Sequence, residues 1–462
     1  MMIIKKSLLA VGMTALTLAS VQVMAKVSPE EAERLKNDLT PVGAERAGNE
    51  DGTIPAWNPN FQIPAEYNGT GSYYPNPYKD DEVLFTITAE NVDQYKDKLT
   101  PGTQAMFKSY PETFEMKVYP SRRDGRYSSL AEQEVFKNAT RSELIEGGNG
   151  VTNAFVGFPF PIPKTGIEAL WNQMIRAGSY ASDGKYSQMV VYRNGSRLHG
   201  RQHTVRYSPF QDAENHTLES FGVNGDVNPR IYQLTQTLKP TREKGKGVLV
   251  HEFINPKLKP RAAWSYIPGV RRVRRAPTIN YDSPQGLGNM QTTDAFLGFN
   301  GAPDKYNWEL LGKKEIYIPY NNYDFENPEL SYDDILGQGH ANPEHMRYEL
   351  HRVWVVRGVL KDDERHVYKT RELFIDEDSW QTVYADHYDN RDVLWRTTHI
   401  NTINMYDLPG IGGRTELYYD LISRDYMAAN LFNEEGGVPK MNHEVKQLSY
   451  FTPNNLRKLG MR

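Results

Sequence analysis

The sequence predicts a mainly β protein of the α+β class, with one large curved antiparallel sheet covered by helices and extended at its N-terminal end. Three observations predict this fold. From about residue 186 onward, runs of β-branched and aromatic residues alternate with short polar turns. The chain contains 29 Tyr, 17 Phe, 28 Pro and 36 Gly, which suits a β protein with many turns better than a helical bundle. The strands follow one another without intervening helices, so a parallel sheet is not indicated.

The first 25 residues are predicted to be a secretory signal peptide. Lys5 and Lys6 give a positive start, residues 8–23 carry no charge, and Ala25 ends a small-residue segment that a signal peptidase recognises. The apolar run is too short for a membrane anchor, and no stop-transfer pattern follows it. We therefore expect the mature chain to begin at Lys26 and to work in the periplasm of a Gram-negative host. Association with the outer membrane is left open.

Composition excludes several function classes. The formal net charge of −4 argues against nucleic acid as the main partner. The chain has no Cys, which excludes disulfides, thiolate zinc sites, cysteine nucleophiles and a lipid attached to cysteine.

Residues 26–150 are predicted to form a helical and loop extension that packs on the sheet. Ser28 precedes Pro29 and Glu31, a helix start, and this helix should run to about Asn37. Short helices are expected at 89–98 and 130–139, and a loop rich in Pro, Asn and aromatic residues spans 57–78. These segments have too few apolar residues to form a core of their own.

Residues 165–177 form the strongest predicted helix. Thr165 and Glu168 match a capping box. One apolar stripe follows at helical spacing, made of Ile167, Leu170, Trp171, Met174 and Ile175. We expect this helix to cover the apolar face of the sheet.

The sheet is predicted to occupy residues 151–462. Asn194-Gly195 predicts a hairpin with a type I′ turn. Polar turns at 361–364 and 376–378 indicate antiparallel neighbours. On one strand, Tyr348, Leu350, Trp354 and Val356 should share a face, interrupted by Arg352. Further strands are expected at 229–238, 247–255, 262–267, 314–320, 346–360, 366–375, 380–388, 392–402 and 414–425.

Three segments together resemble a known bacterial family. They are residues 39–48 (LTPVGAERAG) with 52–57 (GTIPAW), residues 159–163 (PFPIP) with 168–172 (EALWN), and residues 263–275 (AWSYIPGVRRVRR). The chain is identified as a member of the exported family known as domain of unknown function 1329, also described as outer membrane lipoprotein-sorting protein. The third segment is similar to a wider group related to the lipoprotein carriers LolA and LolB.

This resemblance implies an antiparallel β half-barrel with helices across its mouth and an apolar cavity between them. It also implies a role in moving lipids or other hydrophobic molecules beside resistance-nodulation-division (RND) exporters and outer-membrane proteins. The chain is about twice as long as a simple LolA-type carrier. It also lacks the lipid-bearing Cys of LolB.

Two sets of residues are candidates for binding. The first is apolar and would line the cavity, although each member could equally be an ordinary core residue: Trp171, Met174, Trp264, Tyr266, Tyr348 and Trp354. The second is basic and would hold an anionic head group or an acidic partner, unless it is a solvated turn: Arg271, Arg272, Arg274 and Arg275. On a strand, Arg272 and Arg274 would face away from Arg271 and Arg275.

The sequence does not match the motifs of common catalytic or metal sites. Residues 178–186 have the wrong spacing for a phosphate loop, and no Gly-x-Ser-x-Gly or His-Glu-x-x-His motif is present. His199 with His203, or His340, His345 and His351 near Glu344, could bind a metal. Surface or hydrogen-bonding roles are more frequent for scattered histidines, so we predict no metal, cofactor or catalytic site.

We therefore predict a non-enzymatic periplasmic carrier or adaptor for a lipid or other hydrophobic ligand. Its predicted partners are an RND exporter, an outer-membrane protein and, peripherally, a membrane surface. Two alternatives stay open: a cargo-free module that bridges exporter and outer-membrane protein, and a periplasmic hydrolase with an unrecognised site.

Overall fold

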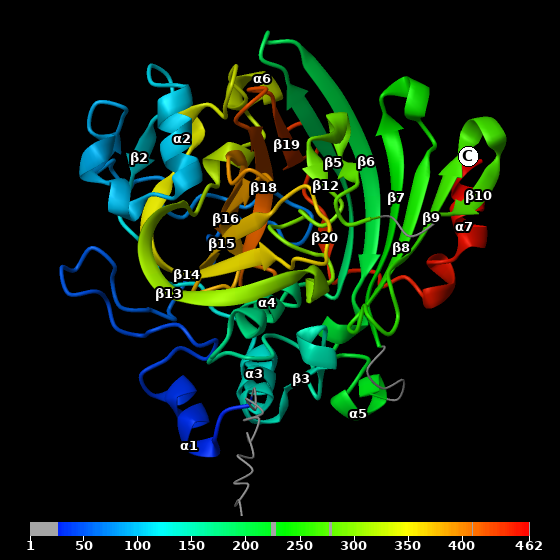
Figure 1. Ribbon diagram of the computed structural model, residues 1–462, viewed down its shortest axis with the longest axis horizontal. Helices are drawn as coiled ribbons and strands as arrows, with labels where there is room; N and C mark the ends of the chain where they lie inside the picture. Colours follow the sequence, from blue (N-terminus) through cyan, green and yellow to red (C-terminus); the bar gives the residue numbers. More distant parts are fainter. Residues whose placement is uncertain (1–25, 223–227, 277–279, 409, 462) are drawn as a thin grey trace, which may run out of the picture.

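The computed structural model describes residues 26–222, 228–276, 280–408 and 410–461, so the predicted signal peptide lies outside the described residues. One large curved sheet dominates the molecule (Figure 1). Its central strands follow the order β13-β14-β15-β16-β17-β18-β19-β5-β6-β7-β8-β9-β10, with antiparallel neighbours throughout that path. The sheet is open, and strands β13 and β10 lie at its two ends. The predicted fold class is confirmed.

The strands of this path largely match the predicted ranges, with β13 longer than expected. The predicted strand at 414–425 covers most of β18 and the turn that follows Asp420, and β19 begins only after that turn, at Tyr426. The bounds are β5 Ala181–Val191, β6 Arg197–Tyr207, β7 Pro229–Lys239, β8 Gly247–Phe253, β9 Ala262–Ile267, β10 Arg272–Arg275, β13 Tyr306–Pro319, β14 Tyr348–Leu360, β15 Thr370–Asp376, β16 Thr382–Tyr388, β17 Leu394–Asn404, β18 Ile411–Asp420 and β19 Tyr426–Leu431.

Short strands complete the described structure. Strands β1 and β2 extend the sheet at the start of β14, where Val118 of β2 pairs in parallel with Tyr348, and β20 pairs with β5. Their bounds are β1 Phe85–Ile87, β2 Met116–Val118, β3 Glu143–Ile145, β4 Gly150–Thr152, β11 Pro284–Gln285, β12 Gln291–Thr292 and β20 Lys440–Met441.

The helix prediction was confirmed where a capping box precedes an apolar stripe at helical spacing. Helix α4 (Gly166–Met174) begins at the predicted capping box, with the Glu168 amide donating to Thr165 Oγ1 and the Thr165 amide donating to Glu168 Oε2. The segment predicted to be helical at 89–98 forms two short 3₁₀ helices, Val92–Gln94 and Lys96–Lys98, and no α-helix. The helix of this region is α2 (Pro101–Ser109), capped by Thr100. The remaining helices are α1 Pro29–Ala32, α3 Ser129–Arg141, α5 Leu218–Phe221, α6 Tyr332–Ile335 and α7 Pro453–Gly460.

The predicted β5–β6 hairpin is confirmed, but its turn is not type I′. A type I′ turn needs positive φ at both central residues. Only Gly195 of the Asn194-Gly195 pair has positive φ, +83°. The Tyr192 amide donates to the Ser196 carbonyl, and the Gly195 amide donates to the Tyr192 carbonyl, which closes a three-residue loop.

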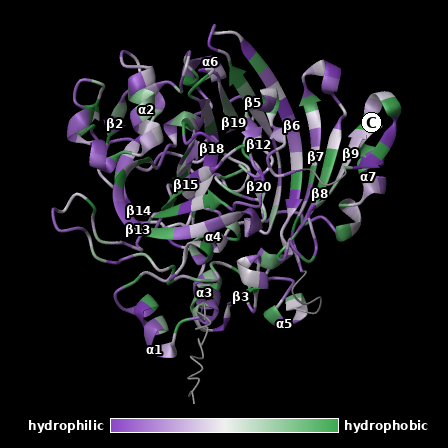
Figure 2. Ribbon diagram, in the orientation of Figure 1, coloured by the Kyte–Doolittle hydropathy of each residue, from purple (hydrophilic) through white to green (hydrophobic). Residues whose placement is uncertain are grey.

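The two faces of the sheet are covered differently. One register row crosses the inner face from β14 to β6 through Val356, Leu373, Ala385, Thr398, Tyr418, Met427, Val190 and Leu198. Helix α4 packs on the β14–β16 end of this face, where Trp171 shares a core with Val356 and Leu373. Figure 2 shows hydrophobic and hydrophilic residues alternating along the strands, as expected when neighbouring side chains point to opposite faces.

The outer face is covered by the N-terminal extension and by the C-terminal helix. Helix α2 packs on β16 and β17, and the Gly102 amide donates to Asp386 Oδ2 at 2.7 Å. Helix α7 packs on β8, β9 and β10.

The β3–β4 hairpin crosses the boundary expected at residue 150, and Val135 of α3 shares a core with Trp171. Among the described helices, none has the length and apolarity needed to cross a membrane.

The 376–378 turn joins β15 to β16 as predicted, but it is buried. Asp376, Glu377 and Asp378 are each less than a tenth exposed. Arg123 from the extension donates to both oxygens of Asp378, and Arg352 donates to Glu377 Oε1 at 2.6 Å. Arg123 of the extension and Arg352 of β14 together supply the positive charge that allows this acidic turn to lie inside the molecule.

Candidate ligand-binding cleft

A cleft of about 790 Å³ lies over the inner face of β5–β9. This volume falls within the usual range of ligand pockets, roughly 300–1,000 Å³. Residues after α4, the segment 285–300 and strand β18 close its sides. Helix α4 therefore covers the end of the inner face near β14, and the cleft lies over the end formed by β5–β9.

The lining of the cleft is amphipathic, whereas the sequence predicted an apolar cavity. Apolar walls come from side chains that include Met174, Ile175, Phe210, Val248, Val250 and Ile411. Polar groups come from the inner-facing positions of β6 and β7, which include Gln202, Thr204, Gln233 and Thr235. Thr204 and Thr235 lie opposite each other in the register, with their hydroxyls 3.0 Å apart. Because alternate residues of one strand share a face, this polar row continues to Arg206.

Arg176 and Arg206 are the charges that distinguish the cleft. Both side chains are half-buried and line it. Within the described residues neither forms an ion pair, and Arg206 Nε has no hydrogen-bond partner. Arg176 Nη1 donates only to the Gln173 carbonyl, at 3.3 Å. Two guanidinium groups without a carboxylate partner leave donors available to an anion.

The electrostatics of these two residues agree with that geometry. Burial, reinforced by the nearby charges of Arg176 and Arg230, lowers the pKa of Arg206 to about 10. Burial also lowers the pKa of Arg176. An anion placed between the two groups would relieve both their mutual repulsion and their loss of hydration.

Two carboxylates of the lining are already satisfied. Glu252 accepts from Arg230 and lies 2.7 Å from Arg261; burial raises its pKa, but these arginines outweigh burial and bring it to about 2. Burial raises the pKa of Glu416 to about 7, against hydrogen bonds from Tyr418 and from the Leu297 amide at 2.7 Å. Neither carboxylate neutralises Arg206 by direct contact.

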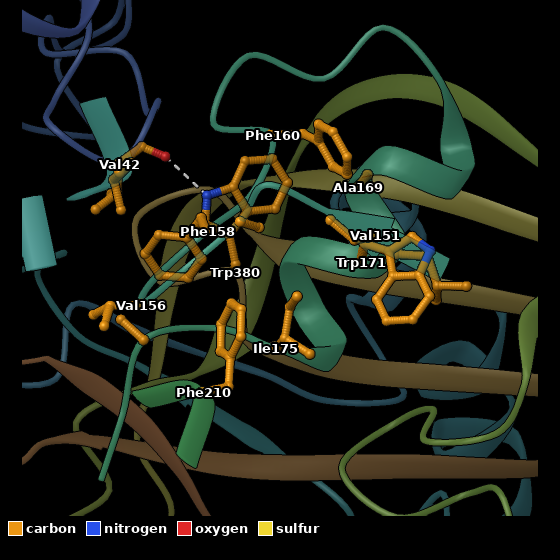
Figure 3. Close-up of a cluster of buried hydrophobic side chains, with 14 of the residues drawn as sticks. Val42, Val151, Val156, Phe158, Phe160, Ala169, Trp171, Ile175, Phe210 and Trp380 are labelled. Carbon is orange, nitrogen blue, oxygen red and sulfur yellow. Dashed lines mark hydrogen bonds between the residues drawn. The ribbon is translucent and has the colours of Figure 1, made fainter. Parts of the chain in front are cut away.

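Of the six predicted apolar lining residues, the cleft includes Met174. Trp171 is 1% exposed and donates from Nε1 to the Gly148 carbonyl at 2.8 Å, so it belongs to the core beneath α4. Figure 3 shows Trp171, Phe158, Ile175 and Trp380 within this core. Trp354 packs against the same core from β14.

The remaining three predicted residues lie away from the cleft. In β9, Trp264 pairs with Leu249 and Tyr266 with Gly247, so both aromatic side chains face outward beneath α7, in a core with Leu456. Ala263, one position from Trp264, lines the cleft instead. Tyr348 is buried where β2 meets β14. None of these three side chains lines the cleft, and a part for them in ligand binding stays a prediction.

The four predicted arginines lie on the exposed β9–β10 hairpin. Arg272, Arg274 and Arg275 belong to the end strand β10, and Arg275 lies over the Trp264 ring at 5.9 Å. Arg271 precedes the strand with φ +48°, so the predicted alternation does not extend to it. Ile267 and Val270 are exposed in the same hairpin. This basic hairpin, residues 267–275, is separate from the cleft arginines.

Sequence reasoning missed Arg176 and Arg206. Arg176 directly follows the apolar stripe of the predicted helix, and Arg206 ends an alternating row with Gln202 and Thr204. That row was visible in the sequence. The sequence did not show which face of strand β6 lies over the cleft.

Comparison with known proteins identifies the family. Residues 86–457 match the family described as protein of unknown function, DUF1329. Over 460 residues, the chain is 43% identical to the uncharacterized protein PA3922 of Pseudomonas aeruginosa, covering 99% of each chain. The chain belongs to the DUF1329 family.

Solved structures with related descriptions are more distant. A DUF1329 family protein from Desulfovibrio piger is 13% identical, with a TM-score of 0.41, over 60% of this chain and 92% of that one. A putative outer membrane lipoprotein-sorting protein domain from Vibrio parahaemolyticus is 14% identical, with a TM-score of 0.41, over 61% and 92%. The LolA superfamily protein NE2245 from Nitrosomonas europaea is 12% identical, with a TM-score of 0.36, over 61% and 94%.

Proposed function

We propose that this DUF1329 protein is a periplasmic carrier that binds a hydrophobic molecule with an acidic head group in the cleft. The observation that carries the proposal is the pairing of apolar walls with Arg176 and Arg206, two arginines without a carboxylate partner among the described residues. The apolar walls would hold a hydrocarbon chain, and the two guanidinium groups would bind a carboxylate or phosphate.

The energetics suit reversible transport. Burying a sixteen-carbon chain gains roughly 10 kcal/mol gross, at about 0.8 kcal/mol per CH₂. Lost freedom of the ligand and ordering of the lining offset part of this gain. A charge-assisted hydrogen bond to each arginine adds about 1.5–3 kcal/mol. The cargo is therefore held firmly but released when a better acceptor is offered, and no covalent step is required.

The location and partners are part of the same proposal. Support for the periplasm comes from the signal-peptide pattern of residues 1–25 and from the lipoprotein-sorting descriptions of similar proteins. We place the carrier between an RND exporter and the outer membrane, as the family resemblance implies. The basic hairpin would meet the anionic membrane surface, since it combines four arginines with exposed Ile267 and Val270.

Binding of paired ligands to the delipidated mature chain tests the proposal. Palmitate and hexadecanol have the same chain length but differ in the acidic group. By isothermal titration, palmitate should bind at least 10-fold more tightly than hexadecanol. Arg206→Gln and Arg176→Gln should each weaken palmitate binding about 10-fold, because one charge-assisted hydrogen bond is lost. Neither substitution should change the affinity for hexadecanol.

Arg197→Gln is the matched control, since Arg197 lies on the same strand but pairs with Asp333 outside the cleft. Failure of both ligands to bind would refute the carrier. Equal binding of both ligands, unaffected by either arginine variant, would refute the acidic head group and leave the carrier standing.

A further inference from the structure

A buried cluster beneath the β15–β16 hairpin has the composition of a metal site. His351 lies on β14, Asp376 ends β15, and Asp378 lies in the following turn. Their exposed fractions are 1%, 0% and 8%. One nitrogen or oxygen atom from each residue lies within 4.8 Å of the others. The cluster is separate from the ligand cleft, whose lining does not include these three residues.

The facing atoms in this cluster make no hydrogen bonds with one another. His351 Nδ1 is 3.9 Å from Asp376 Oδ1 and 3.9 Å from Asp378 Oδ2, both beyond hydrogen-bond range. Among the described residues, His351 Nδ1 and Asp376 Oδ1 have no hydrogen-bond partner at all. Buried polar atoms without partners are uncommon, and two that face each other point to a missing group.

The hydrogen bond made by Nε2 of His351 determines that Nδ1 is the ring nitrogen that faces the cluster. His351 Nε2 lies 3.1 Å from Glu349 Oε2, and a carboxylate there accepts the Nε2 proton. His351 Nδ1 then faces two buried carboxylate oxygens. These three atoms need a positive charge beside them, which a proton on Nδ1 or a bound metal ion would supply.

Neighbouring residues hold each ligand in the orientation that metal sites require. Ser379 Oγ donates to Asp376 Oδ2 at 2.5 Å, which leaves Oδ1 free. Arg123 donates to both oxygens of Asp378 at 2.8 Å. Glu349, which orients His351, is itself held by Arg347 at 2.6 Å. Hydrogen bonds of this kind fix ligand geometry and raise metal affinity.

Charge also favours a cation. Arg123 neutralises Asp378, and Arg347 neutralises Glu349. In the described part of the chain, Asp376 has no Arg or Lys partner, so its charge faces only His351.

We propose that His351 Nδ1, Asp376 Oδ1 and Asp378 Oδ2 bind one divalent first-row transition ion of the zinc or manganese type. One imidazole with two carboxylates suits such ions better than calcium or magnesium. Metal–ligand distances near 2.0–2.2 Å require the three atoms to close in by about 0.5 Å. The ion would tie β14 to the β15–β16 hairpin and, through Arg123, to the carbonyls of Glu45, Ala47 and Pro55 in the extension.

The test uses the full mature chain without a histidine tag. After treatment with chelator under partly denaturing conditions and refolding, the protein is titrated with Zn²⁺, Mn²⁺ or Ca²⁺. Elemental analysis after gel filtration should find about one Zn²⁺ or Mn²⁺ per chain, together with a rise in Tm. Loss of a residue that only orients a metal ligand typically weakens metal binding about 10–100-fold. We expect His351→Gln and Asp376→Asn to weaken it by more than 100-fold.

His399→Gln is the matched control, because His399 is equally buried but has no acidic neighbour within ion-pair distance in the described structure; it should retain the metal. Asp376→Asn keeps the shape of the side chain, so it separates loss of the ion from loss of the fold. Wild-type protein that takes up neither Zn²⁺ nor Mn²⁺ would overturn the proposal. A response to Ca²⁺ alone would do so as well.

Discussion

The indole of Trp380 stacks on that of Trp354, with ring centroids 6.0 Å apart and planes inclined by 10°. Trp380 Nε1 donates to the Val42 carbonyl at 2.8 Å, shown by the dashed line in Figure 3. Trp354 Nε1, by contrast, is buried without a partner among the described residues. One tryptophan therefore joins the extension to the sheet, and its neighbour does not.

This difference predicts unequal effects of the same substitution. Trp380→Phe should lower the free energy of unfolding by about 1–3 kcal/mol more than Trp354→Phe, because only Trp380→Phe leaves a buried carbonyl without its donor. Urea denaturation of the two variants measures the difference. Equal losses would mean that the Val42 contact contributes nothing to stability.

Asp386 predicts a pH dependence of stability. Burial raises the pKa of this carboxyl to about 7, despite hydrogen bonds from Thr397 and Gly102. The protonated carboxyl contributes its full share to the free energy of unfolding below about pH 3.8. This stabilisation is lost as pH rises toward 7, because Asp386 of the unfolded chain releases its proton at a lower pH than Asp386 of the folded protein. The expected loss is up to about 4 kcal/mol, from roughly three pKa units.

Asp386→Asn cannot ionise, so the stability of wild type relative to this variant should fall between pH 4 and 7 and then level off. Chemical denaturation at several pH values checks this. Asp389→Asn is the control, because hydrogen bonds from the Val393 amide and from Arg391 lower the pKa of half-buried Asp389, so any pH effect should have the opposite sign. A constant difference between wild type and Asp386→Asn would contradict the prediction.

Gly460 determines how closely helix α7 approaches the sheet. A Cβ at this position would lie 2.1 Å from Cδ1 of Tyr266. Gly460→Ala should therefore loosen α7, cost about 1–3 kcal/mol of docking energy, and speed proteolysis of the C-terminal segment. At Gly269 an added Cβ would meet nothing within 4 Å, so protease should cleave the Gly269→Ala protein at the wild-type rate. A resistant Gly460→Ala protein would show that the Tyr266 ring can move aside.

The basic hairpin predicts binding to anionic membranes. Arg272→Glu with Arg274→Glu should reduce sedimentation with vesicles containing phosphatidylglycerol at least 10-fold, since each basic residue near such a surface contributes about 1 kcal/mol. Lys79→Glu with Lys108→Glu changes the net charge equally at exposed positions of the extension. If both pairs reduce binding equally, net charge and not the hairpin is responsible.

The sequence predicted the fold well because its signals were local. The capping box of Thr165 and Glu168 lies within a single element and appears in the structure. The strand predicted at 346–360 is also present, as β14, although residues on both of its faces are buried. Helix α2 was missed although Thr100-Pro101 is a recognisable start, because its apolar residues are few and its partners Asp386 and Leu417 are distant in sequence.

The site was harder to predict because it depends on which face of each strand is covered. Trp264 and Tyr266 were assigned to the cavity by their apolarity, yet helix α7, which was not predicted, covers them. Arg206 lies on the uncovered face. The acidic turn at 376–378 was expected to be an ordinary polar turn, because no local pattern reveals that Arg123 from the extension reaches it.

The open sheet leaves β13 and β10 with unpaired backbone groups on one side in the described structure. Such edges can recruit strands from other copies and begin aggregation. Three arginines in the four residues of β10, and exposed Asn307, Glu309 and Lys314 along β13, make that recruitment unfavourable. A sheet with charged edge strands can therefore stay open without acting as a template for polymerisation of its own chain.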